Sequence, residues 1–348
     1  MFSFRKFSVI NCILAIRICF GHFCELSTSK RVNFVCKYYC IVFYIWQIIF
    51  LYKYLLLAST HLYLQLILVC FKSISNALIA VFFKESYFFK YCADVETIDK
   101  VLRFNVKSTI YSIVVYGMSL IHYIIITIFI FKTYNAGSFF EFCSFLVSDV
   151  SLMLASIVIS LSYEMFWTRM KLLKDYFKQY VHNGDLTVES KNFHLKQFTH
   201  VYKSLLDAVK DANAALKIKM FIDTIFVFSK MVTETHFQII AVISDGFSLN
   251  MILPITSILA HFYLTFLGVI FLELVLKEYE EIKGMIALEL VRCEDAEYHD
   301  EIVLTLEYLE VRAPRYSIWR IFPLDISLLT GLLNCSVTYI IVLLSFKY

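Results

Sequence analysis

The chain has 348 residues, of which 59% are hydrophobic and 18% are charged, and its mean hydropathy is +0.70. Soluble domains are about 45–50% apolar, so a water-soluble fold cannot bury this surplus, and the composition indicates a membrane protein. The net charge of +3 is too small to favour nucleic acid as a partner, and ten Cys without a CxxC pattern do not support zinc or thioredoxin-type chemistry. We therefore expect no cofactor and no metal.

The first apolar run, residues 7–20, is short, contains Arg17 and follows Arg5 and Lys6. Such a run is compatible with a signal peptide, a span or a helix that lies on a membrane surface. Because no small-residue cleavage site follows it, we predict an amphipathic helix on the cytoplasmic face within residues 1–32.

Seven longer apolar runs follow, each long enough to cross the hydrocarbon core of a bilayer, which takes about 20 helical residues. The predicted spans are residues 33–57, 61–83, 108–131, 139–163, 219–244, 250–276 and 321–346. The chain has only 8 Gly and 3 Pro, so its helices are rarely interrupted. The expected fold class is an all-α membrane protein whose single seven-span domain covers residues 1–348.

Basic residues fall mainly on one side of these spans. Of 32 Lys and Arg, five precede the first span, and five, ten and six lie in the second-to-third, fourth-to-fifth and sixth-to-seventh connections. The opposite side has only Lys132 and Lys347, and the other four lie within spans. Because cytoplasmic connections are enriched in Lys and Arg, this bias predicts a cytoplasmic N-terminus and an extracellular C-terminus.

The connections on the basic side are long and show helical spacing of apolar residues. In residues 164–218 and 277–320 charged residues alternate with apolar ones, and Asn183-Gly184-Asp185 marks a turn between two helices. The second helix is predicted to begin near Leu186 and to run into the fifth span. We expect these extensions to pack together as a helical cytoplasmic anchor.

The C-terminal segment carries a recognisable motif. Thr338 and Tyr339 are followed by five apolar residues, 340–344, and then by Ser345 and Phe346. This order resembles the C-terminal signature of the insect gustatory receptors, TYhhhhhQF, in which h is hydrophobic and Ser345 stands at the Gln position. The number of spans, their orientation and the chain length also resemble that family.

The resemblance implies a ligand-gated, non-selective cation channel in the plasma membrane of sensory neurons, opened by a small-molecule tastant. It also implies a homo- or heterotetramer with related subunits, in which four seventh spans surround one pore. On a helix Thr338, Val342 and Ser345 share a face, and a face of hydroxyl and apolar groups can gate by dewetting. We place Val342, Ser345 and Phe346 near the gate. The alternative is that Thr338 and Ser345 donate to backbone carbonyls one turn back.

Polar side chains inside the spans indicate a ligand site, because a charge in hydrocarbon costs about 2.5–3.5 kcal/mol on insertion scales. Small-molecule pockets combine a few polar groups with aromatic rings. We therefore predict a polar cavity in the outer half of the bundle. The candidate ligand-binding residues are Tyr116, His122, Tyr123, Asp149, Glu234, His236 and His261, with Tyr263 as a further aromatic. The alternative is structural pairing, such as Lys230 with Glu234 one turn apart.

Other classes of membrane protein fit the sequence less well. A G-protein-coupled receptor has its N-terminus outside, and a secondary transporter usually shows internal repeats and spans broken by Gly or Pro. The scattered His and acidic residues do not have the spacing of an enzyme site, so no enzymatic activity is expected. A receptor that signals through a second messenger and a small-molecule transporter remain the alternatives.

Overall fold

The structure is a computed structural model that describes residues 8–23, 29–55, 60–83, 86–101, 114–122, 124–125, 128, 139–182, 186–246, 252–318 and 322–345. Its elements are α1 Ser8–Cys19, α2 Lys30–Leu55, α3 Thr60–Phe83, α4 Ser86–Val101, α6 Phe139–Phe177, the π-helical turn η1 Lys178–His182, α7 Val188–Asp245, α8 Ile252–Arg292, α9 Ala296–Val311, β1 Ser317–Ile318, β2 Phe322–Pro323 and α10 Ile326–Ser345. Residues 114–122 are also helical. The described part is therefore all-α apart from one short strand pair, as the composition predicts.

Three of the helices are much longer than a bilayer is thick. α6, α7 and α8 contain 39, 58 and 41 residues, which makes them roughly 60, 85 and 60 Å long against about 30 Å for the hydrocarbon core. The unbroken α7 confirms the prediction of a helix that begins near Leu186 and includes residues 219–244. The predicted turn at residues 183–185 lies outside the described residues.

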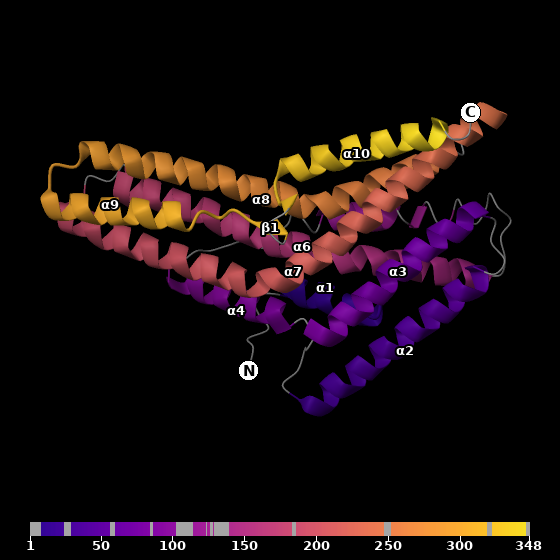
Figure 1. Cartoon of the computed structure of the whole chain (residues 1–348). Coiled ribbons are helices and arrows are strands. Elements are labelled where there is room, and N and C mark those ends of the chain that lie inside the picture. Colours follow the sequence, from indigo (N-terminus) through magenta and orange to yellow (C-terminus); the bar gives the residue numbers. More distant parts are fainter. Residues whose placement is uncertain are drawn as a thin grey trace.

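The helices form an elongated bundle (Figure 1). α6, α7, α8 and α9 run side by side at one end, whereas α2, α3 and α10 lie towards the other. α6 is the central helix, because every residue from 150 to 166 is buried. Its neighbours α7 and α8 pack along it, and they bring the fifth and sixth predicted spans against the fourth.

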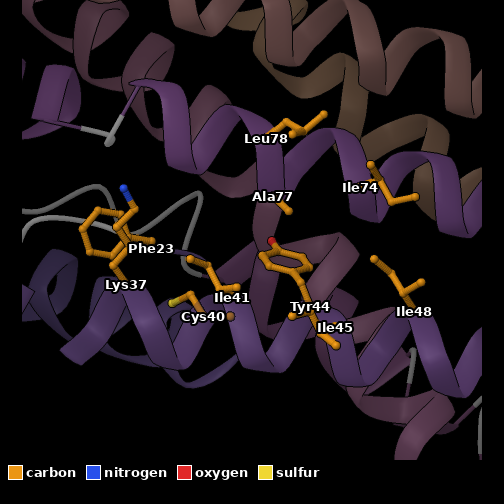
Figure 2. A pocket seen from close by; sticks show the side chains of 11 residues that line it. Phe23, Lys37, Cys40, Ile41, Tyr44, Ile45, Ile48, Ile74, Ala77 and Leu78 are labelled. Atoms are coloured by element: carbon orange, nitrogen blue, oxygen red, sulfur yellow. The ribbon is translucent and has the colours of Figure 1, made fainter. Parts of the chain in front are cut away.

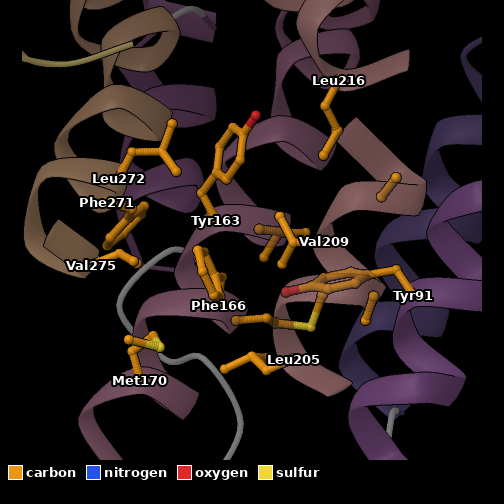
Figure 3. Close-up of a cluster of buried hydrophobic side chains, with 14 of the residues drawn as sticks. Tyr91, Tyr163, Phe166, Met170, Leu205, Val209, Leu216, Phe271, Leu272 and Val275 are labelled. Atoms are coloured by element: carbon orange, nitrogen blue, oxygen red, sulfur yellow. The ribbon is translucent and has the colours of Figure 1, made fainter. Parts of the chain in front are cut away.

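The centre of the bundle is packed with large apolar side chains (Figure 3). The buried cluster includes Tyr163, Phe166 and Met170 of α6, Leu205, Val209 and Leu216 of α7, and Phe271, Leu272 and Val275 of α8. α8 approaches α6 closely at Gly268. A Cβ atom there would lie 3.1 Å from Ile159 Cγ2 and 3.3 Å from Tyr163 Cδ2, so this glycine permits the contact between the two helices.

Ion pairs join the helices at the end of the bundle away from α2 and α10. Arg169 on α6 binds Asp99 on α4 through two nitrogens, at 2.8 and 3.2 Å. Lys283 on α8 lies 2.7 Å from Glu310 on α9, and this hydrogen bond raises the pKa of Lys283. The predicted helical extensions are therefore present and held together by charge as well as by packing.

Four helices among the described residues are long and apolar enough to cross a membrane: Lys30–Phe50, Leu146–His182, Ile255–Arg292 and Ile326–Ser345. They coincide with the predicted first, fourth, sixth and seventh spans. The second predicted span contains a shorter apolar helix, Ile67–Ile79, and the fifth forms part of α7. Half of the third, residues 108–131, lies outside the described residues, so the number of seven spans stays a prediction.

The segment predicted as a helical extension, residues 277–320, contains the end of α8, a separate helix α9 and the strand β1. Asp295 caps the start of α9 by accepting a hydrogen bond from the Tyr298 N–H, and the helix ends at Val311. β1 and β2 then pair in antiparallel register before α10 begins. α9 and α10 run in the same direction along the bundle, and the strand pair lies between them (Figure 1). The apolar periodicity of the segment did not predict these strands.

The N-terminal helix α1 packs against the bundle through one face. Leu14 and Arg17 are buried, and Arg17 Nε donates a hydrogen bond to the carbonyl oxygen of Leu154 on α6 at 3.0 Å. This docking was not predicted, because a lone Arg in a short apolar run indicates a surface helix. The position of α1 relative to the cytoplasmic face stays a prediction.

Candidate functional site

A buried ion pair joins three helices within the predicted spans. Lys72 Nζ on α3 lies 3.0 Å from Asp223 Oδ1 on α7, and the two side chains are only 1% and 3% exposed. Ser156 on α6 donates a hydrogen bond to the other carboxylate oxygen of Asp223 at 2.6 Å. A buried charge is tolerated when it is paired and hydrogen-bonded, and here each carboxylate oxygen of Asp223 has a partner.

A second charged pair lies further along α7. Lys230 Nζ is 3.6 Å from Glu234 Oε1 one turn away, and it donates to Ser257 Oγ of α8 at 3.2 Å. The structural alternative for Lys230 and Glu234 is therefore confirmed as a contact. The pair also ties α7 to α8.

An aromatic ring, Phe226 of α7, contacts both Lys72 and His261. The Phe226 ring centroid lies 4.5 Å from Lys72 Nζ, which is the geometry of a cation–π contact. The Phe226 ring and the buried imidazole of His261 on α8 pack in a T-shaped arrangement, with ring centroids 5.7 Å apart. We call Lys72, Ser156, Asp223, Phe226, Lys230, Glu234, Ser257 and His261 the polar cluster.

Further polar groups surround the polar cluster. Tyr116, in the helical residues 114–122, is buried. Asn76 Nδ2 on α3 and Thr224 Oγ1 on α7 are buried, and neither has a hydrogen-bond partner among the described residues. Since a buried polar atom without a partner costs about 1–3 kcal/mol, these atoms mark places where water or a ligand would be stabilised.

The last helix, α10, is the least buried of the long helices. It packs on α7 through Ser336 and Ile340, and the Tyr339 ring lies 5.9 Å from Phe228. Its apolar side chains Val337, Ile341, Val342 and Leu343 are exposed. Within one chain, therefore, most of α10 has no protein neighbour in the described part of the structure.

The hydroxyl groups of α10 bond to its own backbone. Thr338 Oγ1 donates to the carbonyl oxygen of Asn334 at 2.9 Å, and Ser345 Oγ donates to that of Val342 at 2.7 Å. This is the alternative that the sequence left open for both residues. It satisfies the hydroxyls locally, and the side chain of Phe346 lies outside the described residues.

The fold has known relatives, although no protein-family profile and no curated protein matches the sequence. The insect olfactory receptor OR5 from Machilis hrabei superposes with a TM-score of 0.58 and 15% identity, over 97% of each chain. The same receptor in complex with eugenol gives a TM-score of 0.54 and 14% identity, over 98% of each chain. The chain has the fold of the insect olfactory receptors. At the level of the fold, this is compatible with the resemblance drawn from the C-terminal motif.

Within this insect olfactory receptor fold, part of the predicted ligand site comes together. His261 and Glu234 belong to the polar cluster, and Tyr116 is buried. His122 is half-buried, and the ring of His236, also half-buried, contacts its chain neighbour Phe237. Tyr123 and the side chain of Asp149 lie outside the described residues.

Sequence reasoning missed the most buried members of the polar cluster. Lys72 and Asp223 each lie inside a predicted span. Two opposite charges within hydrocarbon could have indicated that these residues form a pair. Their pairing across 151 positions of the chain has no local pattern. Ser156 and Ser257 gave no signal, because single serines inside spans usually bond to their own helix.

Proposed function

We propose that the protein is a chemosensory receptor that acts as a ligand-gated, non-selective cation channel in the plasma membrane of a sensory neuron, where a small-molecule tastant opens it. The observation that carries this proposal is the likeness of fold over nearly the whole of both chains, which includes the exposed α10. A relative of the same fold is known in complex with eugenol, a small molecule, and this supports a small-molecule ligand here. The proposed activity is conduction and not catalysis.

The polar cluster is the proposed ligand site. It lies between α3, α6, α7 and α8, and pockets between the helices of a bundle are common sites for small molecules. Lys72 and Asp223 neutralise each other, which leaves Asn76, Thr224, Tyr116 and His261 to present polar atoms beside aromatic rings. We therefore propose a ligand that carries hydrogen-bonding groups on an apolar or aromatic frame. His122, Tyr123, Asp149 and His236 remain proposed contacts nearer the outer end.

α10 is the proposed pore helix. Its exposed apolar side chains need a covering, and a homo- or heterotetramer with related subunits supplies one by placing four copies around a central axis. Val342, Ser345 and Phe346 are proposed to form the gate. Because Ser345 Oγ already donates to the backbone, a pore face here presents mainly apolar surface, which favours gating by dewetting.

Ligand-evoked current tests the proposal. The full chain is expressed in oocytes, alone and with candidate partner subunits, and current is recorded while a panel of sugars, bitter compounds and amines is applied. A cation current that follows the agonist without delay and survives G-protein inhibition supports the receptor-channel.

Two outcomes separate the alternatives. A response that survives channel block but requires G proteins would indicate a second-messenger receptor. Uptake of labelled ligand without any conductance would indicate a transporter. A matched pair of variants, Thr224→Val next to Asp223 of the polar cluster and Thr199→Val in the distant part of α7, shows whether a change in agonist potency is specific to the region of the cluster.

A further inference from the structure

A groove of 320 Å³ lies between α2 and α3, apart from the polar cluster (Figure 2). Its lining residues are Gly21, Phe23, Lys37, Cys40, Ile41, Tyr44, Ile45, Ile48, Ile74, Ala77 and Leu78. The α2 residues recur every three or four positions, so they form one face of the helix. From Lys37 to Ile48 that face is roughly 16 Å long at 1.5 Å per residue.

The inside of the groove is almost entirely apolar. Tyr44 has the only side-chain hydroxyl in the lining, and that group is 3.1 Å from His22 Nδ1. His22 Nε2 lies 2.7 Å from the carbonyl oxygen of Ser151, which can only accept, so Nε2 donates and Nδ1 accepts from Tyr44. The tyrosine hydroxyl is therefore already hydrogen-bonded, and a molecule in the groove would contact mainly carbon atoms of the walls.

One end of the groove is basic. Figure 2 shows the Lys37 nitrogen beside Phe23, away from Ile48 and Ile74. Lys30 and Arg31 are exposed in the first turn of α2, on the same side of the groove. No Asp or Glu occurs between Glu25 and Glu85, so neither α2 nor α3 supplies a carboxylate to neutralise these cations.

We propose that this groove binds an anionic phospholipid, with one acyl chain between α2 and α3 and the phosphate on Lys37, Lys30 and Arg31. Long apolar slots suit a hydrocarbon chain, and lysine and arginine at a membrane surface attract anionic headgroups. A Lys side chain set about two turns inside a helix end reaches the interface by extending its charged tip. The source is the leaflet that faces the start of α2, which is the cytoplasmic one under the proposed orientation.

The lipid would contact the junction of three helices. Gly21 and Phe23 form the end wall of the groove, and His22 between them bonds both α6 and α2. Gly21 has φ of +86°, and a Cβ atom there would lie 2.3 Å from the Phe43 ring, so only glycine fits this turn. Occupancy of the groove therefore stabilises the docking of α1.

Lipid retention tests the proposal. The purified full chain is reconstituted in nanodiscs that contain phosphatidylserine and phosphatidylcholine in equal amounts with the same acyl chains. It is then transferred to detergent, and the bound lipid is counted by native mass spectrometry. The variants are Lys37→Gln, Lys37→Arg, Ala77→Phe to fill the groove, and Lys53→Gln at the opposite end of α2 as the matched control.

We expect the wild type to retain phosphatidylserine over phosphatidylcholine. Lys37→Gln should lower the retained phosphatidylserine about fivefold, which corresponds to about 1 kcal/mol for one basic side chain near an anionic headgroup. Lys37→Arg and Lys53→Gln should match the wild type, and Ala77→Phe should lose the lipid.

Equal retention of the two lipids by the wild type, or undiminished phosphatidylserine in Lys37→Gln, would overturn the proposal. If Ala77→Phe does not fold, the comparison of Lys37→Gln with Lys37→Arg is sufficient to test the lipid proposal. If the groove instead bound a tastant, Ala77→Phe would alter agonist potency and leave the retained phosphatidylserine unchanged. If it bound a second copy of the chain, Ala77→Phe would alter the mass of the complex and leave the retained phosphatidylserine unchanged. Either result would also contradict the lipid proposal. The lipid count does not depend on channel activity, so its failure is distinguishable from failure of the proposed function.

Discussion

At the scale of the residue, the pair of Lys72 and Asp223 shows how two charges persist inside an apolar bundle. Each is almost fully buried, and together with Ser156 they satisfy one another across α3, α6 and α7. Breaking such a pair costs more than replacing it, because the single variant leaves one charge buried without its partner. The pair therefore holds the three helices in one arrangement around the proposed ligand site.

A double-mutant cycle measures this coupling. We expect Asp223→Leu alone to destabilise the protein by about 3–5 kcal/mol, whereas Lys72→Met with Asp223→Leu should recover most of that loss. The measurement is the thermal unfolding midpoint of purified protein in detergent, with Lys90→Met at the exposed pair with Asp211 as control. Additive losses in the double variant would show that the two residues do not depend on each other.

Two glycines of α8 provide a second test at this scale. A methyl group at Gly268 would press on Ile159 and Tyr163, whereas at Gly284 nothing lies within 4 Å of the added Cβ among the described residues. Gly284→Ala should raise stability by about 0.5–1 kcal/mol, because alanine loses less entropy in a helix.

The same substitution at Gly268 should be neutral or destabilising, since overpacking costs about 1–3 kcal/mol and opposes that gain. Thermal unfolding of both variants under identical detergent conditions gives the comparison. If Gly268→Ala stabilised the protein as much as Gly284→Ala, the close packing of α8 on α6 would be wrong.

At the scale of the element, the sequence of α10 was enough to predict a terminal helix, whereas its proposed role in the pore depends on other subunits. Its apolar length and its C-terminal motif predicted a terminal helix, and the structure places that helix at Ile326–Ser345. The sequence could not show which residues face α7. In the structure Ser336 and Ile340 are buried on that face. Pairs of residues with i and i+4 spacing occur on every face of a helix, so spacing alone does not identify the face that packs on α7.

Ser345→Gln restores the residue that the gustatory signature has at this position, and it should change conduction. The longer amide cannot repeat the short hydrogen bond to the Val342 carbonyl, so it extends from the helix. We expect single-channel conductance or relative cation permeability to change, with agonist potency shifted less than about threefold, because potency belongs to a separate site.

Single-channel and bi-ionic recordings of wild type and Ser345→Gln provide the measurement. Thr330→Gln, near the start of α10, is the control for adding the same side chain elsewhere on the helix. A shift in potency with unchanged conductance would contradict the assignment of Ser345 to the pore.

Secondary structure was predictable to a large extent because the physical causes are local. Long apolar runs with few Gly and Pro predicted the helices, and helical spacing predicted that the fourth, fifth and sixth spans extend well beyond the membrane. The strand pair β1–β2 and the docking of Arg17 onto Leu154 were not predictable, because each depends on residues that meet only after folding. The same holds for Lys72 and Asp223.

At the scale of the whole molecule, the distribution of basic residues and the arrangement of the bundle point to one orientation. The ion-paired end is formed by α4, α9 and the extensions of α6, α7 and α8, and many of the Lys and Arg of the chain lie there. Lysine and arginine are translocated less readily than other residues, so this end is proposed to face the cytoplasm. The C-terminus, at the far end of α10 in Figure 1, is then extracellular.

Epitope tags at the two ends of the chain test this orientation in living cells. A tag after Tyr348 should stain on intact cells, whereas a tag before Met1 should stain only after the membrane is permeabilised. An intracellular marker protein controls for leaky cells, and a channel with a known extracellular tag controls for surface expression. Staining of the C-terminal tag that required permeabilisation would place the basic end outside. That result would contradict the cytoplasmic location of the anchor, the leaflet assigned to the bound lipid and the receptor-channel topology. All three depend on the same orientation of the chain in the membrane.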